Sequence, residues 1–482
     1  MRIMVQGTSS SCGKSLVTTA LCRIFTEDGY KVCPFKSQNM SLNSYVTDEG
    51  LEMGRAQALQ AFACKIKPKA YMNPILLKPT TDRKSQVIIL GKPYKNMDAR
   101  EYFNFKKSLR EKIKEIYNEI EKKYDIVVIE GAGSPAEINL KEDDFVNMGM
   151  AEIANSNVIL VADIDRGGVF AFIYGTYMLL EENERKRIKG IIINKFRGDK
   201  SLLMSGIEKI ENLIKVPVIG VIPYIDIRLE DEDGIVELYT EYKGKIKVSV
   251  IRLPRISNST DFNPFLFDED VSLNYADDPE EIEDADIVII PGSKNTIEDL
   301  RWLKKKGFYK KLKEHKGIIF GICGGYQMMG KVVIDEEGWE TKKGDHEEGL
   351  NFFECVTYLK GEKTLRNVEG IAFGKKVKGY EIHMGETENN KNPFVEIHSE
   401  GKVFYDGDMK DFKYFGTYLH GIFDSGEFRE EILNMVRKKK GLEYKKSEEF
   451  YIKREEELSK LSKIFRENVD VDYIYEIMKK DD

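Results

Sequence analysis

Short apolar runs alternate with helical patterns along the first half of the chain. They lie at residues 3–7, 31–35, 125–130, 157–163, 188–194 and 216–222. Runs that are apolar without a break are typical of strands in a parallel sheet, because helices cover both faces of such a sheet. Residues 99–123 carry spaced apolar side chains among charged ones, which predicts an amphipathic helix before the strand at 125. The pattern therefore predicts a first α/β domain over residues 1–240.

A second α/β series follows a polar stretch at 230–245, which we interpret as the junction between domains. Its predicted strands lie at 246–254, 285–293 and 316–325. We expect a second domain over 246–437, again a mostly parallel sheet covered by helices. The tail, 438–482, is rich in Lys and Glu and places Leu458, Leu461 and Phe465 at helical spacing. It predicts a C-terminal helix packed on the second domain.

Composition narrows the class of protein. The chain has 482 residues, too many for a single core, and 41% of them are hydrophobic. Its net charge of −7 comes from 75 basic and 82 acidic residues without a long block of one sign, which argues against a nucleic-acid track or a polybasic membrane patch. The six cysteines form no CxxC pair, and no apolar run is long enough for a signal peptide or a membrane span. We expect a cytoplasmic enzyme of small molecules.

The segment GTSSSCGKS, residues 7–15, lies between the first strand and an apolar helix. In that context a glycine-rich segment predicts a phosphate-binding loop, whose backbone N–H groups surround the phosphates. Five residues separate the two glycines, one more than in the usual Walker motif, and counting from Thr8 restores that spacing. The lysine adds a positive charge and the final serine can hold Mg²⁺. The candidate ATP-binding residues of the loop are Gly7, Thr8, Gly13, Lys14 and Ser15.

The segment GIIFGICGGYQMMG, residues 317–330, runs from a buried strand through a Gly-rich turn into a helix. The glycines at 321, 324 and 325 permit the tight turn that presents Cys323 at the edge of the sheet, as in a nucleophile elbow. The helix N-terminus favours a thiolate, so Cys323 is the candidate nucleophile.

A cysteine nucleophile needs a group that accepts its proton, and His420, in YFGTYLHGIF, is the candidate base. A cysteine elbow followed about a hundred residues later by a histidine resembles the class I glutamine amidotransferases. That resemblance implies an oxyanion strand at 289–296, with the N–H groups of Gly292 and Gly324 holding the tetrahedral intermediate. Many of these enzymes carry a glutamate two residues after the histidine, where this chain has Ile422. A Cys–His dyad and a third residue from elsewhere, with Asp424 as a candidate, both stay open.

The remaining histidines carry no such motif. His315 lies in a Lys-rich segment and is expected to be solvated, and His346 and His398 are expected on the surface. His383, in YEIHMGET, has no assigned role, because a structural hydrogen bond and a substrate contact are both open.

The long phosphate loop resembles that of dethiobiotin synthetase and its relatives, which activate carboxylates with ATP. The resemblance implies that Lys36 lies near the reacting carboxylate, with Gln38 and Asn39 as further substrate candidates. It also implies that Glu130 binds magnesium together with Ser15, and that Asn194 reads the adenine edge. The second acidic ligand of that family has no clear match here. Arg55 lies about where it would stand, and Asp48 is the alternative metal ligand.

Six further stretches narrow the resemblance, and together with both halves they resemble the cobyric acid synthase family over nearly the whole chain. They are KSQNMSLNSYVT, MNPILLKP, SQVIILG, VADIDRGGVFA, PGSKNT and YEIHMGET. The resemblance implies amidation of the b, d, e and g carboxylates of adenosylcobyrinic acid a,c-diamide in cobalamin biosynthesis. It implies one glutamine and one ATP per amide, Mg²⁺, and phosphorylated carboxylate intermediates.

Three other interpretations compete. Cobyrinic acid a,c-diamide synthases share the domain order. A ParA-like scaffold ATPase would share only the phosphate loop, has no glutaminase half, and usually carries a further lysine that this loop lacks. A catalytically dead regulator is disfavoured by the intact Cys323, His420 and Lys14. The sequence leaves the order of amidations and the oligomeric state, including a homo-oligomer, open.

Overall fold

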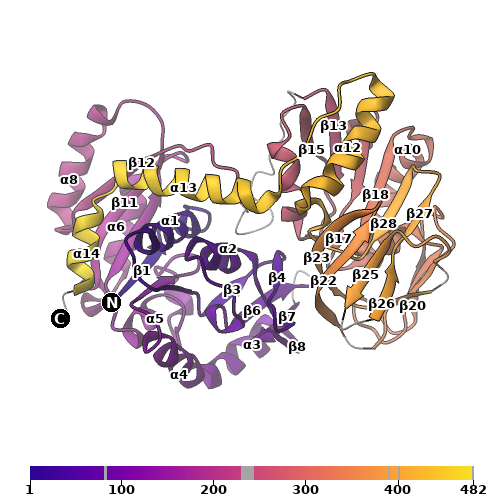
Figure 1. Ribbon diagram of the computed structural model, residues 1–482. Helices are drawn as coiled ribbons and strands as arrows, with labels where there is room; N and C mark the ends of the chain where they lie inside the picture. Colours follow the sequence, from indigo (N-terminus) through magenta and orange to yellow (C-terminus); the bar gives the residue numbers. More distant parts are fainter. Residues whose placement is uncertain (81–83, 230–243, 362, 389, 400–401, 480–482) are drawn as a thin grey trace.

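The computed structural model shows two lobes joined by the chain and by a long helix (Figure 1). It describes all residues except 81–83, 230–243, 362, 389, 400–401 and 480–482. Most of the predicted junction at 230–245 lies outside the described residues. The two lobes match the two α/β series of the sequence.

The first domain is built on a six-stranded sheet, all of whose strand pairs are parallel. In spatial order its strands are β12 (Val218–Pro223), β11 (Ile188–Phe196), β10 (Val158–Asp163), β1 (Arg2–Gly7), β9 (Ile126–Glu130) and β2 (Val32–Phe35). These are the six apolar runs of the sequence. Each is buried on both faces because helices cover the sheet on either side (Figure 1).

The helices of this domain follow the strands in alternation. They are α1 (Lys14–Glu27), α2 (Arg55–Ala63), α3 (Ala99–Lys106), α4 (Arg110–Glu121), α5 (Met148–Ile153), α6 (Val169–Leu179), α7 (Glu182–Arg185) and α8 (Met204–Ile214). The amphipathic helix expected over 99–123 is present as α3 and α4, which a short 3₁₀ turn at Lys107–Leu109 separates. Ile113, Tyr117 and Ile120 of α4 form its buried face.

The apolar pattern did not predict the short strands between β2 and α3, whose pairs are antiparallel except β3–β6. One sheet contains β3 (Gln38–Met40), β6 (Ile75–Pro79), β7 (Lys84–Ile89) and β8 (Lys92–Asp98). A two-stranded ribbon of β4 (Ser44–Val46) and β5 (Glu52–Gly54) points toward the second domain (Figure 1).

The second domain is built on another six-stranded sheet. In spatial order its strands are β15 (Val271–Ala276), β13 (Ile246–Ile251), β16 (Ile287–Ile290), β18 (Ile318–Ile322), β28 (Tyr414–Thr417) and β27 (Asp408–Lys410). Only the edge pair β27–β28 is antiparallel. The helices are α9 (Thr296–Lys306), α10 (Phe308–Glu314), α11 (Gly324–Met329) and α12 (Gly426–Lys440).

Smaller sheets flank this core. One holds β19 (Val332–Asp335), β20 (Asp345–Glu348), β21 (Val356–Tyr358) and β24 (Glu386–Glu388). Another holds β22 (Thr364–Ala372), β23 (Lys375–His383), β25 (Val395–Ser399) and β26 (Lys402–Asp406). A two-residue pairing joins β14 (Ile256–Ser257) to β17 (Gly292–Ser293).

The C-terminal tail is helical, but our expectation that it packs on the second domain was wrong. Helix α13 (Phe450–Asn468) returns to the first domain, where it lies along α1 and β12, and α14 (Val471–Lys479) follows it (Figure 1). Leu458, Leu461 and Phe465 are fully buried in a cluster with the outer face of the first sheet. The apolar stripe of the tail thus covers a surface of the first domain, and the stripe alone does not indicate which surface it covers.

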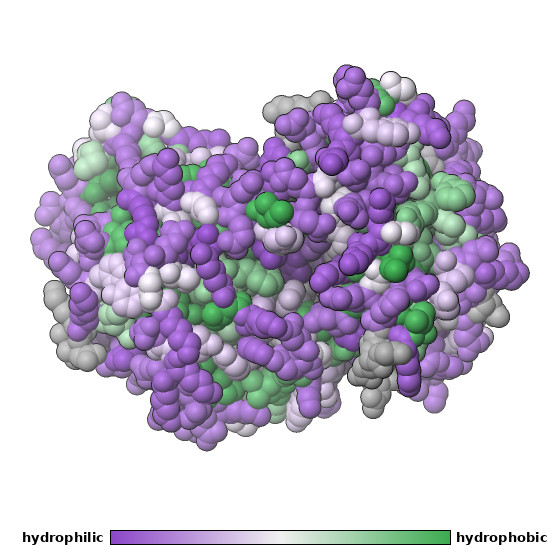
Figure 2. Space-filling view, in the orientation of Figure 1, coloured by the Kyte–Doolittle hydropathy of each residue, from purple (hydrophilic) through white to green (hydrophobic). Residues whose placement is uncertain are grey.

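The face of the molecule shown in Figure 2 is mostly hydrophilic, with apolar side chains scattered over both lobes. Among the described residues, no helix combines the length and apolar character needed to cross a membrane.

Candidate active sites

Cys323 occupies the turn between β18 and α11. Its backbone has φ 51° and ψ −110°, in a region that side-chain-bearing residues seldom adopt. Such a strained turn presents the nucleophile at the end of a strand, and the side chain is almost fully buried. The structure therefore agrees with the elbow expected from the glycine pattern.

His420 reaches the same place because it follows β28, the parallel neighbour of β18. The register pairs Ile322 with Thr417, so residues just beyond both strands meet at one edge of the sheet. His420 is completely buried. Burial alone would lower its pKa, but the charges of Asp261 and Cys323 and their hydrogen bonds to the ring raise it to about 10. The imidazole is therefore held ready to carry a positive charge beside the thiol.

Asp261 is the functional residue that the sequence analysis missed. Its Oδ2 lies 2.6 Å from His420 Nδ1, and its Oδ1 accepts a hydrogen bond from the Gly421 N–H at 3.2 Å. It lies at the start of the second domain, in a 3₁₀ segment at Ser259–Phe267. The arrangement is a Cys–His–Asp triad, in which Asp261 rather than Asp424 contacts the base.

The two glycines expected at the oxyanion hole lie against this triad. A side chain on Gly292 would place its Cβ 3.1 Å from His420 Cε1, and one on Gly324 would place its Cβ 2.9 Å from the Ser293 nitrogen. The elbow and β17 thus approach each other so closely that a side chain at Gly292 or Gly324 would not fit without a shift of its neighbours. This close approach brings both backbone segments to the neighbourhood of Cys323 and His420.

A cavity of about 330 Å³ lies in the second domain, close to the nucleophile. Cys323 Sγ is 3.9 Å from the carbonyl oxygen of Ile382, and the next residue, His383, lines the cavity. His383 stacks on Tyr418 with ring centroids 3.8 Å apart, and burial lowers its pKa to about 3, so it is neutral. Arg366 forms an ion pair with the buried Glu381 at the wall of the same cavity. The cavity therefore offers a cation, an anion and aromatic rings beside the thiol.

The other histidines lie away from this chemistry. His346 and His398 are exposed, as expected. His315 is buried instead of solvated, and desolvation lowers its pKa to about 4. Its Lys-rich neighbours concealed the burial because the lysine and glutamate residues next to it, at 313, 314 and 316, are exposed.

The phosphate loop has the expected form in the first domain. Gly13 takes a left-handed conformation (φ 100°). It ends the loop immediately before Lys14, the first residue of α1. Lys14 folds back over the loop, and its Nζ donates to the Ser9 carbonyl at 3.1 Å. Thr8 is nearly buried, and its N–H donates to Val161 O on the neighbouring strand. Gly7 leaves no room for a side chain, since a Cβ there would lie 2.3 Å from Cys12 Sγ.

Asn194 ends the apolar core of β11 beside this loop. Its Nδ2 donates to the Cys12 carbonyl at 3.0 Å. A side chain on Gly13 would collide with it. The structure therefore brings Asn194 to the loop, as expected for a residue near the nucleotide.

Glu130 is completely buried at the carboxyl end of β9, where its carboxylate collects three polar side chains. Ser15 Oγ donates to Oε1 at 2.7 Å, Lys36 Nζ lies 2.7 Å from the same oxygen, and Gln60 Nε2 donates to Oε2 at 2.5 Å. The structure thus gathers Ser15, Lys36 and Glu130 at one point, and Lys36 is buried rather than solvated.

Gln60 was not identified from the sequence. It lies on α2, the helix on which we placed Arg55 at the position of the missing acid. Arg55 instead lies over the Tyr45 ring at 5.6 Å, and Gln60, further along the helix, reaches the Glu130 carboxylate. The only sequence signal was that Gln60 is one of three polar residues, with Arg55 and Gln57, on a helix otherwise made of apolar ones.

Three other candidates lie apart from this cluster. Asp48 is half-exposed and pairs with Lys67 at 2.6 Å, so it does not complete a metal site with Glu130. Gln38 accepts a hydrogen bond from Tyr102 at 2.5 Å, and Asn39 is buried and donates to Gln57 at 3.0 Å. Within the described parts of the chain, no group of three or more His, Cys, Asp or Glu side chains is arranged to hold a metal ion.

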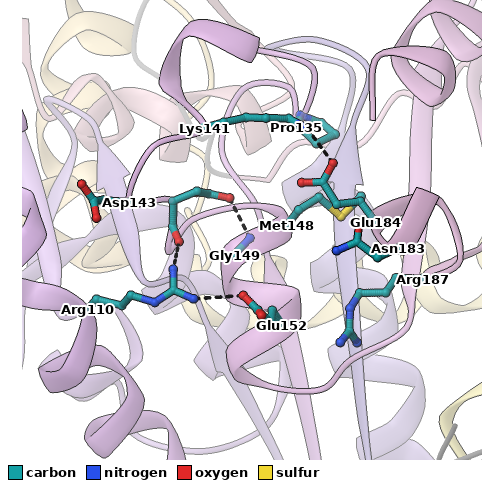
Figure 3. Close-up of a pocket in the computed structure, with 11 residues that line it drawn as sticks. Arg110, Pro135, Lys141, Asp143, Met148, Gly149, Glu152, Asn183, Glu184 and Arg187 are labelled. Atoms are coloured by element: carbon teal, nitrogen blue, oxygen red, sulfur yellow. Dashed lines mark hydrogen bonds and ion pairs between the residues drawn. The ribbon is translucent and has the colours of Figure 1, made fainter. Parts of the chain in front are cut away.

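A second cavity, of about 250 Å³, lies on the first domain among α4, α5 and α7 (Figure 3). Four of its charged groups form two ion pairs, Lys141 with Glu184 at 2.6 Å and Arg110 with Glu152 at 3.0 Å. We assign this cavity no ligand.

Comparison with known proteins gives the same two halves. Residues 3–234 match the model of the CobQ/CobB/MinD/ParA nucleotide binding domain, and residues 247–428 match the CobB/CobQ-like glutamine amidotransferase domain. Among solved structures, a crystal structure of a glutamine amidotransferase covers 39% of this chain and 98% of its own, at 11% identity and a TM-score of 0.30. That score is too low to carry an argument about the fold.

Full-length relatives are much more similar. Cobyric acid synthase of Clostridium acetobutylicum is 50% identical, over 99% of this chain and 98% of that protein. Cobyric acid synthase of Clostridium kluyveri is 51% identical with the same coverage. The chain therefore belongs to the cobyric acid synthase family, glutamine-dependent amidating enzymes of cobalamin biosynthesis.

Proposed function

We propose that this chain is an ATP-dependent, glutamine-hydrolysing ligase that converts adenosylcobyrinic acid a,c-diamide into adenosylcobyric acid by amidating its b, d, e and g carboxylates. The observation that carries this proposal is the pairing, in one chain, of a Cys–His–Asp triad with a phosphate loop that lies against a buried Lys–Glu pair. The first can release ammonia from an amide. The second can place a carboxylate beside a nucleotide phosphate.

In the glutaminase half, Cys323 attacks the side-chain amide carbon of glutamine. His420 takes the thiol proton and later gives it to the departing ammonia, while Asp261 keeps the imidazole oriented and balances its charge. The N–H groups of Gly292 and Gly324 receive the oxyanion. Water then hydrolyses the thioester to glutamate.

Glutamine fits the cavity beside the thiol by charge. Its α-carboxylate would pair with the Arg366 guanidinium, and its α-ammonium with the Glu381 carboxylate, so that the bound zwitterion replaces the ion pair these residues now form. This placement makes Arg366 and Glu381 specificity residues of the glutaminase.

In the ATP-binding half, a corrinoid carboxylate attacks the γ-phosphorus of ATP, and the acyl phosphate that forms gives ammonia a leaving group to displace. Lys14 offsets charge on the transferred phosphoryl group, as in other phosphate loops. Lys36, next to Glu130, is placed to orient the incoming carboxylate. Asn194, whose side chain lies beside the loop, would read the adenine of ATP.

The residues around Glu130 fit a magnesium ion. Mg²⁺ takes oxygen ligands and keeps several waters, so the Ser15 hydroxyl and the Glu130 carboxylate, 2.7 Å apart, form a sufficient protein ligand set. When bound, the ion would neutralise charge on the ATP phosphates. Asp48, paired with Lys67, is not part of this set.

One experiment tests the proposal. Purified protein is incubated with glutamine, ATP, Mg²⁺ and the corrinoid diamide, and the product is followed by mass spectrometry. Each replacement of OH by NH₂ lowers the mass by about one unit, so four successive steps are expected. Conversion of cobyrinic acid itself, with none of its a,c-diamide, would assign the chain to the a,c-diamide synthases instead. ATP hydrolysis with no amide from either substrate would refute the proposal.

We also propose that the chain acts in the cytoplasm and self-associates through α6. That helix has no charged side chain, and Phe172, Tyr174, Met178 and Leu179 remain 41–52% exposed on it. Exposed apolar surfaces of this kind mark contacts between proteins. Light scattering during gel filtration should give a mass above 55.5 kDa, and Phe172→Glu should return it to that of one chain.

A further inference from the structure

The β4–β5 ribbon of the ATP-binding domain reaches the wall of the glutaminase site. Two residues of that ribbon, Asn43 and Ser44, which we call the interdomain segment, meet Asn258 and Ser259 of the second domain. All four are at most 4% exposed. The contact is reciprocal. Asn43 Oδ1 accepts from the Ser259 N–H at 3.0 Å, and Asn258 Oδ1 accepts from the Ser44 N–H at 2.8 Å.

This reciprocal pair fixes the orientation of the Asn258 side chain. Because its Oδ1 is bonded to Ser44, its Nδ2 is turned toward His420 and lies 3.4 Å from both ring nitrogens. Asn258 also adopts a left-handed backbone (φ 54°), which asparagine tolerates better than most residues. Asp261, whose carboxylate contacts the imidazole, follows Asn258 by three residues in the chain.

The interdomain segment also contacts Tyr380, a second residue that packs on the imidazole. The Tyr380 ring stacks on His420, with centroids 5.3 Å apart and planes inclined by 15°. The Tyr380 hydroxyl donates to the Ser44 carbonyl at 3.1 Å. Ser44 therefore bonds, through its N–H and its carbonyl, to two of the residues that contact the ring of His420, Asn258 and Tyr380.

The segment is itself anchored on buried charges. Ser44 Oγ donates to Glu52, whose carboxylate also binds Lys78 of the first domain at 2.8 Å and Lys363 of the second at 2.5 Å. Desolvation would raise the pKa of Glu52, but the two lysines hold it well below its usual range. The ribbon then continues into α2, whose N–H at Arg55 donates to the Asn43 carbonyl and whose Gln60 binds Glu130.

We propose that Asn43 and Ser44 of the ATP-binding domain are positioning residues of the glutaminase, holding the His420 imidazole against Cys323 through Asn258 and Tyr380. The glutaminase site is on this view complete only when the ATP-binding domain is docked. The proposal rests on the proposed function, since it assumes that Cys323 and His420 hydrolyse glutamine. It adds a requirement that lies in the other domain.

The test uses the full-length chain and the variant Asn43→Ala, which changes a residue that touches neither the thiol nor the imidazole. Losing one buried hydrogen-bond acceptor at this contact should lower kcat for glutamine hydrolysis about tenfold, with little change in KM, because the cavity for glutamine is untouched. The pH profile of kcat should change as the imidazole loses its orientation. Amide formation from ammonium chloride should remain at the wild-type rate.

Two further variants make the result specific. Asn367→Ala removes a matched interdomain hydrogen bond, from Asn367 Nδ2 to Thr47 O at 3.0 Å, that does not reach His420, and should leave kcat unchanged. Tyr380→Phe keeps the stacked ring but loses the bond to Ser44, and should reproduce the effect of Asn43→Ala.

Equal losses in Asn43→Ala and Asn367→Ala would overturn the proposal in favour of general domain docking. An unchanged kcat in both Asn43→Ala and Tyr380→Phe would overturn it outright. Failure of the wild-type chain to form amide from glutamine and from ammonium would count against the proposed function instead.

Discussion

Replacing Asp261 by asparagine should disable the glutaminase while keeping the shape of the site. Asparagine has nearly the same volume, but it carries no charge to balance an imidazolium. The pKa of His420 is raised from 6.5 to about 10 against the effect of burial, with Asp261 first among the groups that raise it and Cys323 next. At ~1.36 kcal/mol per pH unit, this difference corresponds to about 5 kcal/mol in favour of the imidazolium.

If Asp261 supplies about half of that stabilisation, its loss costs about 2–3 kcal/mol, or roughly 30- to 160-fold in the population of the ion pair. An asparagine amide that turns its NH₂ group toward Nδ1 would also favour the wrong tautomer of the imidazole. Together these effects predict a fall in kcat for glutamine hydrolysis of about 10²–10⁴-fold. The assay is release of glutamate from glutamine, with ammonium-driven amidation measured in parallel as the activity that should persist.

Asp424→Asn is the matched control, because it removes the carboxylate that sequence position alone suggested. It should change glutamine hydrolysis little. A large loss in Asp424→Asn together with normal activity in Asp261→Asn would refute the triad described above.

The stability of the fold offers an independent check on Asp261→Asn. Because the pKa of His420 is raised on folding, its contribution to stability is complete below pH 6.5 and decreases as the pH rises toward 10. The melting temperatures of wild type and Asp261→Asn should therefore converge over that range.

The remaining predictions concern the nucleophile and the ATP site. Cys323→Ala should abolish amide formation from glutamine but not from ammonium, and loss of both would make the cysteine structural. Lys14→Ala should remove product with either nitrogen source, so ammonium-driven synthesis at the normal rate would contradict the role of the loop. Glu130→Gln should weaken the magnesium dependence of ATP use and also lower the melting temperature, because the buried Lys36 loses its carboxylate. A magnesium titration identical to that of the wild type would show that the role of Glu130 is limited to its ion pair with Lys36.

The central strands and the two loops that follow them could be predicted because each carries a local signal. Continuous apolar runs identified β1, β9, β10, β11 and β18, and glycines before or after a reactive side chain marked the phosphate loop and the Cys323 elbow. Both signals arise from the backbone and from burial at the same position in the chain. Neither signal depends on which distant part of the chain packs against that position.

Asp261, Gln60 and the docking surface of α13 could not be predicted in this way. Asp261 meets His420 only because the 3₁₀ segment at Ser259–Phe267 folds back over the sheet edge. Gln60 could not be singled out because it is one of three polar residues on α2, with Arg55 and Gln57, and only the packing of the helix decides which of them faces Glu130. The stripe of Leu458, Leu461 and Phe465 predicted a buried helix face correctly, but an apolar stripe fits any apolar surface.

The return of the tail to the first domain changes how the two domains can move. Strand β1 and helix α14 both lie in the first lobe (Figure 1), so the amidotransferase domain stands between two parts of the other domain and is tethered by two crossings of the chain instead of one. A domain held by two tethers can hinge about the line between them but cannot rotate freely or drift away. The crossing that leads into α13 is fixed at one end because that helix packs on α1 and β12. The interface between the domains would therefore open by rotation about one axis. On closing, the β4–β5 ribbon would return to the same partners in the second domain.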